Sequence, residues 1–164
     1  MFDNHSVRAG VMTILAVLAI VILPACSREE TQQPAQKKTG LFVINVLFKP
    51  FYDDCHIKGS INVPFPELET FVQNLDPENT EIVVYCSNYM CTSSGQACKR
   101  LKELGFKKVW AYEGGTAEWH QKKLPVEGPC QRPYLTKENV QHQQEGQDAG
   151  CVITAEDLAK KLQV

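Results

Sequence analysis

Residues 81–106 constrain the fold of this chain most strongly, because they join a buried strand to an amphipathic helix through one short loop. Residues 82–85 form an apolar, β-branched run of the length expected for a buried strand. The helix that follows has charged residues on one face and apolar residues on the other, namely Ala97, Cys98, Leu101 and Leu104. Gly105 stands where a left-handed C-terminal cap belongs.

Cys86 is the first residue of the loop and faces the start of this helix, where Ser93 and Ser94 are suitable N-cap residues. Unpaired amide groups at a helix N-terminus stabilise a thiolate and bind anions. The position therefore predicts an ionised, reactive thiol at Cys86. From this stretch alone, a buried cysteine that acts as a small apolar side chain remains an equal alternative.

Strand patterns alternate with helix patterns on both sides of this stretch. The strand patterns cover residues 41–46, 61–63, 82–85 and 108–112, and the helix patterns cover residues 50–54, 66–75, 97–104 and 113–119. Such alternation indicates an α/β fold with a parallel sheet. Ligands of these sheets bind outside the carboxyl ends of the strands, which is where we expect Cys86.

The first 39 residues do not share this pattern and predict an exported protein. Residues 11–23 form an apolar run that is too short to span a bilayer but has the length of a signal-peptide core. The sequence LPACS at residues 23–27 resembles a bacterial lipobox, which implies a lipoprotein signal peptide over residues 1–25 and lipidation of Cys26. An ordinary secretory signal with an incidental Cys26 is the alternative.

Residues 26–39 are polar and lack periodicity, so we interpret them as a flexible tether. With the lipid anchor, they predict a protein of the bacterial cell envelope that faces the periplasm or lies at the outer membrane. The membrane is then a partner through the lipid. A net charge of −2 with scattered basic residues gives no indication of nucleic-acid binding.

Five motifs follow one another along residues 41–126. They are DCHIKGSINVP, the strand ending VVYC, the helix opening SGQA, the segment LGFKKVWAYEGG, and AEW followed by LPV. In this order and spacing they resemble rhodanese-like domains. The resemblance implies an α/β domain over residues 40–128, with a mainly parallel sheet of about five strands and helices on both faces.

The same resemblance implies a sulfurtransferase, with Cys86 at the position of the family's catalytic cysteine. Its thiolate would attack the outer sulfur of thiosulfate or a related small sulfur-donor anion and form a persulfide, and a thiol or cyanide would accept that sulfur. No cofactor is implied, and no cysteine spacing matches a zinc site. The residues expected to bind the substrate follow Cys86 in the loop and are Ser87, Asn88, Tyr89, Met90, Cys91, Thr92 and Ser93.

The loop departs from the family pattern because it is about two residues longer and contains no basic side chain. Loss of a partly buried cation weakens anion binding by on the order of 1–3 kcal/mol. Rhodanese-related phosphatases use an arginine at this loop, so its absence argues against that activity. Asn45 and Leu47 stand where the family often has Asp and Arg, which predicts a less rigid rim, and His56 matches a turn histidine that is usually structural.

Cys91 is a second cysteine within the loop, and two interpretations of it remain open. In the first, Cys91 resolves a persulfide or sulfenate on Cys86 and leaves a Cys86–Cys91 disulfide, which a redox partner protein would reduce. In the second, Cys91 is incidental. The first interpretation predicts a thiol–disulfide redox protein as an alternative function, and a catalytically silent binding module is a third.

The other cysteines also suggest an oxidising compartment, since seven cysteines is a high count for a cytosolic enzyme. We expect Cys98 to be inert packing, Cys55 to be half exposed, and Cys130 to pair with Cys151. Residues 129–164 form a polar tail that ends in a short helix, with Thr154 as its N-cap. This helix either docks on the domain or serves as a hook for a partner.

Overall fold

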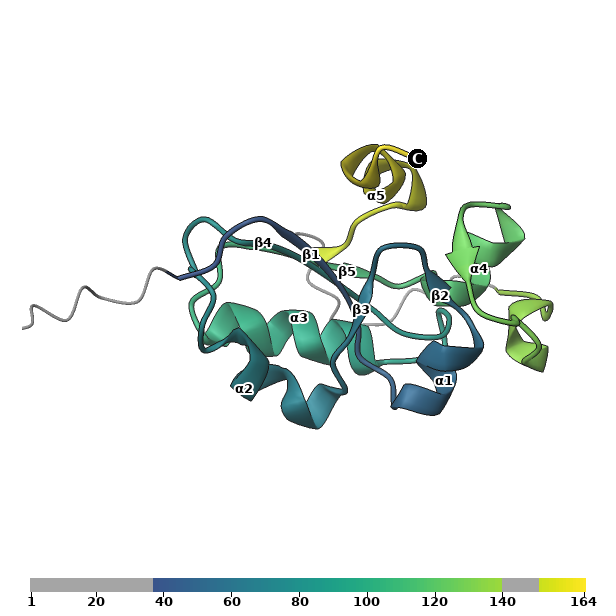
Figure 1. Cartoon of the computed structure of the whole chain (residues 1–164), viewed down its shortest axis with the longest axis horizontal. Coiled ribbons are helices and arrows are strands. Elements are labelled where there is room, and N and C mark those ends of the chain that lie inside the picture. The colour runs from purple at the N-terminus through teal and green to yellow at the C-terminus, as the bar shows by residue number, and fades with distance from the viewer. Residues whose placement is uncertain (1–36, 140–150) are drawn as a thin grey trace, which may run out of the picture. The chain divides into compact units, whose positions relative to one another are not determined.

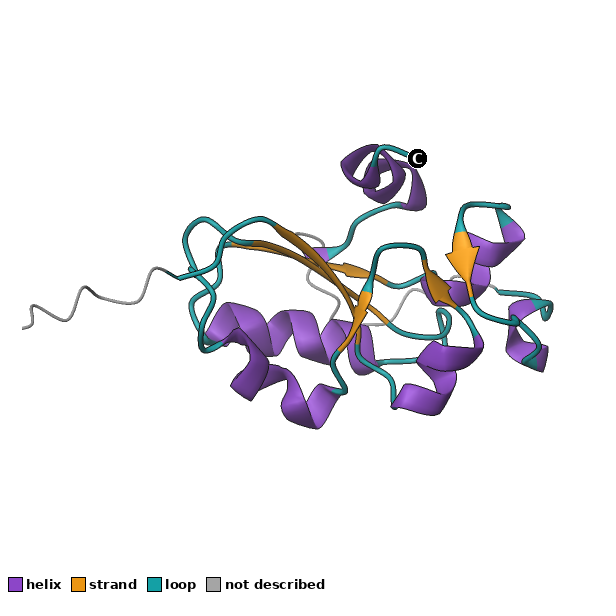
Figure 2. Ribbon diagram, viewed as in Figure 1, coloured by secondary structure: helices purple, strands orange, loops and turns teal. Residues whose placement is uncertain are grey.

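The computed structural model describes residues 37–139 and 151–164, which belong to one compact unit spanning residues 35–164. Within these described residues, no helix is both long enough and apolar enough to cross a membrane. Four parallel strands form the main sheet in the order β3-β1-β4-β5 (Figure 2). They are β1 (Leu41–Asn45), β3 (Ile61–Asn62), β4 (Glu81–Tyr85) and β5 (Lys108–Tyr112).

Helices cover both faces of this sheet, because successive residues of a strand point to opposite sides. Ile82 and Val84 of β4 pack against α2 (Leu68–Val72) and α3 (Ser93–Glu103). Val83 and Tyr85 contribute to the core on the other face, together with residues of α4 (Gly115–Gln121) and α5 (Ala155–Leu162). Figure 1 shows α2 and α3 on one side of the sheet and α5 on the other. The predicted α/β fold class is confirmed.

The sequence pattern did not predict two features of the strands: a second sheet, and a bridge beside β5. The two-residue strands β2 (His56–Ile57) and β6 (Val126–Glu127) pair antiparallel in a small second sheet. Beyond β5, Val152 forms a single parallel bridge with Ala111, and the Ile153 amide donates to the Ala111 carbonyl at 3.1 Å. A fifth strand of the main sheet is therefore reduced to one bridge.

The long helix α3 ends as expected but begins differently. At its C-terminus, Gly105 has a φ of +95°, and the Phe106 amide donates to the Leu101 carbonyl at 3.1 Å, which is the predicted glycine cap. The N-cap position is Thr92, which has helical backbone angles and no side-chain cap bond. The prediction of a Ser93 or Ser94 cap is wrong, because the loop enters the helix already curled and the Ser94 hydroxyl turns inward.

The C-terminal helix α5 docks on the domain, which decides between the two roles considered for it. Its buried residues Ala155, Leu158 and Ala159 join the core of the second sheet face. Thr154 caps the helix, since its hydroxyl accepts a hydrogen bond from the Asp157 amide at 3.1 Å, as the sequence predicts.

Two disulfides cross-link distant segments, and their pairing corrects the sequence-based expectation. Cys55 bonds to Cys130 and Cys98 bonds to Cys151, so the predicted Cys130–Cys151 pair is wrong. Cys55 and Cys98 are fully buried, so Cys55 is not half exposed and Cys98 is not merely packing. At the first bridge, hydrogen bonds of Cys130 and of the two residues after it hold Cys130 beside Cys55.

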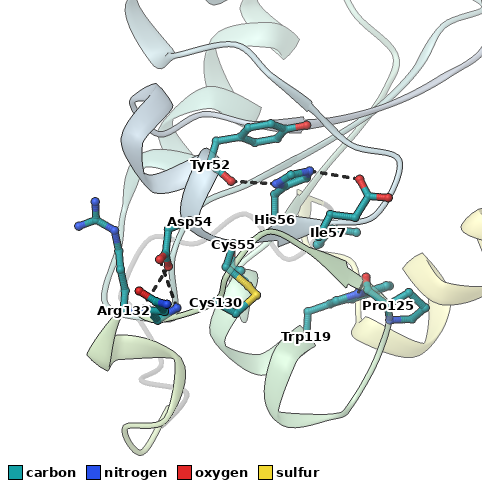
Figure 3. The surroundings of a disulfide bond; sticks show 12 residues. Tyr52, Asp54, Cys55, His56, Ile57, Trp119, Pro125, Cys130 and Arg132 are labelled. Atoms are coloured by element: carbon teal, nitrogen blue, oxygen red, sulfur yellow. Dashed lines mark hydrogen bonds and ion pairs between the residues drawn. A yellow bond between two sulfur atoms is a disulfide. The ribbon is translucent and has the colours of Figure 1, made fainter.

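Asp54 shows how this works at the first bridge (Figure 3). Its carbonyl oxygen accepts the Cys130 amide at 2.7 Å, and its carboxylate accepts the amides of Gln131 and Arg132, each at 3.2 Å. These bonds fold the segment after β6 back over the end of α1 (Lys49–Asp54). A separate 3-10 turn, η1 (Phe65–Glu67), follows β3. The segment then continues into the turn η2 (Pro133–Leu135).

His56 lies beside this bridge and has the structural role that was expected. Its ring stacks on Tyr52 with centroids 3.8 Å apart, and its Nδ1 lies 2.8 Å from the Tyr52 carbonyl oxygen (Figure 3). Its Nε2 lies 3.4 Å from the Glu127 carboxylate. Tyr52 belongs to α1 and Glu127 to β6, so the ring connects β2 to both of these elements.

Asn45 ties the rim at the end of β1, although an aspartate–arginine pair is absent there. Its side-chain oxygen accepts the Leu47 amide at 3.0 Å, and the Asn62 amide group donates to the Leu47 carbonyl at 2.8 Å. Asn62 therefore connects β3 to the end of β1, and Asn45 fixes the turn that follows β1.

Candidate active site

Cys86 lies directly after β4, at the carboxyl edge of the parallel sheet. The chain leaves β1 toward β3 on one side and then returns to β4 on the other side, so the strand order reverses between β1 and β4. Binding sites of open α/β sheets form at such a switch point. The structure thus places Cys86 at the sheet edge where the sequence predicted it.

The start of helix α4 anchors the backbone of the loop. The Thr116 amide donates to the Cys86 carbonyl at 3.0 Å, and the Ala117 amide donates to the Ser87 carbonyl at 2.9 Å. Gly115 allows this approach, because its φ is +60° and a Cβ atom there would lie 2.5 Å from the Cys86 carbonyl oxygen. The EGG motif predicted a glycine turn here, but not that the turn supports the loop.

Tyr89 holds the outer part of the loop through both its backbone and its side chain. Its amide donates to the Asn139 side-chain oxygen at 3.1 Å, and the Asn139 amide group donates to the Gly114 carbonyl at 3.0 Å. Its hydroxyl donates to the Glu118 carboxylate at 3.1 Å, which also accepts the Tyr112 hydroxyl at 2.8 Å. Burial, followed by the Glu118 charge, raises the pKa of Tyr89 to about 12, so the hydroxyl remains a donor.

The sequence did not identify Asn139 or Glu118 as parts of the site. Asn139 lies 50 residues after Tyr89, in a polar segment whose composition carries no signal of a contact with the loop. Glu118 belongs to the AEW motif, which marked the segment but not the role of its carboxylate.

The residues expected to bind substrate lie together in this loop, but they differ in access. Met90 is 69% exposed and Thr92 is also exposed, whereas Ser87 and Asn88 are half-buried. The loop turns at Asn88, whose carbonyl accepts the Cys91 amide at 3.0 Å. Ser93 is the first residue of α3. The predicted lipidation residue, Cys26, lies outside the described residues.

The Cys86 sulfur is buried and faces oxygen atoms. Its exposed fraction is 0%, and its Sγ lies 3.2 Å from the Cys91 carbonyl oxygen and 3.4 Å from the Ser94 Oγ. The Asn88 carbonyl oxygen lies further away, at 3.9 Å. The hydrogen bond to the Cys91 side chain, followed by burial, raises the pKa of the Cys86 thiol well above its ordinary value. These two effects oppose the predicted ionisation of Cys86, whereas hydrogen bonds from the Ser94 hydroxyl and amide favour it.

Amide groups face both sulfurs: the Ser94 amide donates to Cys86, and the amides of Ser93 and Ser87 donate to Cys91. The Cys86 side chain, then the Ser93 amide and hydroxyl and the Ser87 amide, donate to the Cys91 sulfur and lower its pKa to about 5 against the opposing effect of burial. Cys91 is half-buried, and both cysteines are free. These hydrogen bonds favour ionisation of Cys91 over that of Cys86, and the Cys86–Cys91 disulfide considered above is not formed in this structure.

Comparison with known proteins agrees with this fold. A family model described as "Rhodanese-like domain" matches residues 27–122. The thiosulfate sulfurtransferase GlpE of Coxiella burnetii is 29% identical over 83 residues, which are 51% of this chain and 75% of GlpE. The Bacillus subtilis protein YrkF is 30% identical over 97 residues, which are 59% of this chain and 51% of YrkF. This chain therefore spans about half the length of YrkF.

Two solved structures have a similar fold. The BH2092 protein of Bacillus halodurans matches with a TM-score of 0.50 and 28% identity, over 56% of this chain and 66% of that protein. The rhodanese-like domain of the Anabaena protein Alr3790 also matches with a TM-score of 0.50, at 25% identity, over 66% of this chain and 83% of that domain.

Proposed function

Because this chain belongs to the rhodanese-like domain family, we propose that it is a sulfurtransferase that carries sulfane sulfur as a persulfide on Cys86. The observation that carries this proposal is a free thiol at the carboxyl end of the central strand, with a second free thiol, that of Cys91, in the same loop. The similarity to a thiosulfate sulfurtransferase supports the same class of reaction.

The transfer is a pair of nucleophilic displacements at sulfur. A cysteine thiolate attacks the outer sulfur of a donor such as thiosulfate, the S–S bond of the donor breaks, and sulfite leaves with the electron pair. A persulfide remains on the protein. An acceptor thiolate or cyanide then attacks the outer sulfur, and the cysteine thiolate is restored, so no net oxidation occurs.

The chemistry of the loop suggests how the anionic sulfur donor is bound. The loop from Cys86 to Ser93 contains no basic side chain, so the amides of Ser87, Ser93 and Ser94 are the groups that attract a negative charge. Amide groups without a cation favour a donor of low charge. We expect an organic persulfide or polysulfide to react at a lower concentration than the thiosulfate dianion.

Mass spectrometry of the intact protein after treatment with polysulfide tests the sulfurtransferase proposal. We expect a gain of about 32 Da, the mass of one sulfur atom, that is lost on adding a thiol acceptor. Cleavage by chymotrypsin after Tyr89 separates Cys86 from Cys91 and locates the added sulfur. If no cysteine of the loop gains sulfur, the sulfurtransferase proposal fails.

A thiol–disulfide redox protein is the second candidate, and the hydrogen bond between Cys86 and Cys91 favours it. In that reaction, one thiolate attacks the inner sulfur of the neighbouring persulfide, hydrogen sulfide leaves, and a Cys86–Cys91 disulfide forms. A dithiol reductant would then restore both thiols. The two functions are distinguished by mass, because the disulfide is about 2 Da lighter than the reduced protein and carries no extra sulfur.

We propose further that the protein is exported and anchored to the bacterial cell envelope through a lipid on Cys26. The two disulfides support an oxidising compartment, because such bonds are rare in the cytosol. Metabolic labelling with palmitate tests the anchor. We expect the label in the wild type and not in Cys26→Ala, and equal labelling of both would reject this site of attachment.

A further inference from the structure

The two free thiols of the loop differ in their access to solvent. Cys86 has an exposed fraction of 0%, whereas Cys91 is only half-buried and follows Met90, which is 69% exposed. A sulfur donor from solution therefore meets the Cys91 side chain first. To touch the Cys86 sulfur, it must displace the part of the loop whose Asn88 and Cys91 carbonyl oxygens contact that sulfur.

The loop is braced against such a displacement. Tyr89 is bound at its amide by Asn139 and at its hydroxyl by Glu118, and the Cys91 amide is bound by the Asn88 carbonyl. These contacts come from three different parts of the chain. Opening the loop would break several of them together, so direct attack by Cys86 carries an additional barrier.

The hydrogen bonds around the two sulfurs give them different reactivities. The Cys86 sulfur lies 3.2 and 3.9 Å from two carbonyl oxygens and receives hydrogen bonds from Ser94, while the Cys91 sulfur receives hydrogen bonds from the Ser93 amide and hydroxyl and from the Ser87 amide. A sulfur surrounded by donors is both the better populated nucleophile at neutral pH and the better leaving group. These two properties suit a thiol that first accepts a sulfur atom and then releases it.

We propose that sulfur enters this protein through Cys91 and passes from there to Cys86, so that Cys91 is a second catalytic residue. This inference rests on the proposed sulfurtransferase function. In the interpretation considered from the sequence, Cys91 acts after Cys86 and resolves its persulfide. In the present proposal, Cys91 acts before Cys86.

The proposed relay balances without an added oxidant or reductant. The Cys91 thiolate attacks the outer sulfur of the donor, and the donor's other fragment leaves with the electron pair. The Cys86 thiol then gives its proton to the outer sulfur of the Cys91 persulfide. The resulting Cys86 thiolate attacks that sulfur, the bond to Cys91 breaks, and the electron pair returns to Cys91 as a thiolate. The sulfur ends as a protonated persulfide on buried Cys86.

Charging the variants with polysulfide tests this order. In Cys86→Ser, we expect the added sulfur to appear on Cys91 at the wild-type rate and to stay there. In Cys91→Ser, and equally in Cys91→Ala, we expect charging of Cys86 to slow by roughly tenfold to a hundredfold, since no exposed thiolate remains. Lys99→Ala is the control, because Lys99 is an exposed residue of α3 and lies outside the loop.

Two results separate this inference from the proposed function. If Cys91→Ser charges at the wild-type rate, the entry role of Cys91 is overturned while the sulfurtransferase function stands. If wild type gains no sulfur, the function fails, and a brief reaction with iodoacetamide near pH 6 still tests the order of the thiols. We expect alkylation at Cys91 in preference to Cys86 by roughly a hundredfold, and preferential alkylation of Cys86 would overturn the inference.

Discussion

The bridged cysteines and the free cysteines of this protein lie in two different kinds of surroundings. Cys55–Cys130 and Cys98–Cys151 join segments that are 75 and 53 residues apart. Cys86 and Cys91 are five residues apart in one loop, and they remain free although their side chains contact each other. Proximity alone therefore does not decide which cysteines form bridges here.

The difference lies in what each pair of sulfurs does for the fold. The bridges join segments that lie far apart in the sequence, such as the segment after β6 to the end of α1, and the approach to α5 to α3. The free pair lies where a helix begins and backbone amides lack partners within the helix. Amide groups of this kind stabilise the negative charge of a thiolate, and a disulfide has no such charge.

Removing a bridge is the most disruptive way to test this comparison. Each bridge closes a loop whose entropy corresponds to about 4 kcal/mol of stability in the chain-entropy model. We expect Cys98→Ser/Cys151→Ser to lower the free energy of unfolding by about 2–5 kcal/mol in denaturant titrations. The matched control is Cys86→Ser/Cys91→Ser, which removes the same number of thiols without breaking a bridge. If both double variants lose equal stability, the structural role of the bridge is not supported.

Gly115→Ala tests the support that α4 gives to the free pair. The new Cβ would lie 2.5 Å from the Cys86 carbonyl oxygen, in a backbone conformation that L-residues rarely adopt. We expect a loss of about 2–3 kcal/mol of stability and a lower rate of sulfur charging, because the loop must shift. Gly59→Ala is a useful control, since Gly59 also has positive φ but no atom within 4 Å of the added Cβ. Equal losses in both variants would mean that strain alone, and not the contact with Cys86, explains the effect.

Asn139→Ala sharpens the distinction between the buried and the exposed thiol. It removes the acceptor of the Tyr89 amide and the donor to Gly114, so the loop is held less firmly. We expect about 1 kcal/mol of lost stability and several-fold faster alkylation of Cys86, with Cys91 little changed. Unchanged protection of Cys86 would show that Asn139 does not limit access to it.

Thr154→Ala makes the smallest change, far from the loop. The hydroxyl of Thr154 caps α5, and its loss costs about 1 kcal/mol at a typical N-cap. We expect faster hydrogen exchange in α5 and no change in the reactivity of the free thiols. A change in thiol reactivity would contradict the expectation that the stability of α5 does not affect the loop of the free thiols.

Much of the fold follows from local patterns in the sequence. The strand at residues 82–85, the cap at Gly105 and the capped helix after Thr154 were predicted because each depends on neighbouring residues. β2 and β6 were missed, since two-residue strands are too short to show a periodic pattern. The bridges were mispaired because spacing does not determine which cysteines meet.

The candidate site was predicted in its position but not in its electrostatics. The sequence places Cys86 at the carboxyl end of β4, and the structure agrees. Which amides face which sulfur depends on how the seven residues between β4 and α3 curl, and no sequence pattern specifies that curl. The contact between Tyr89 and Asn139 is similarly long-range, so only the folded chain reveals it.

The ultraviolet absorbance of the thiolate as a function of pH tests the central claim most directly, namely that Cys91 carries the charge and Cys86 keeps its proton. In wild type with both bridges intact, we expect one thiolate to appear as pH rises through about 5. The transition should persist in Cys86→Ser, whose hydroxyl still donates to Cys91, and should be absent in Cys91→Ser. A transition that survives in Cys91→Ser, or a first ionisation near the ordinary cysteine value of about 8.5, would contradict the account.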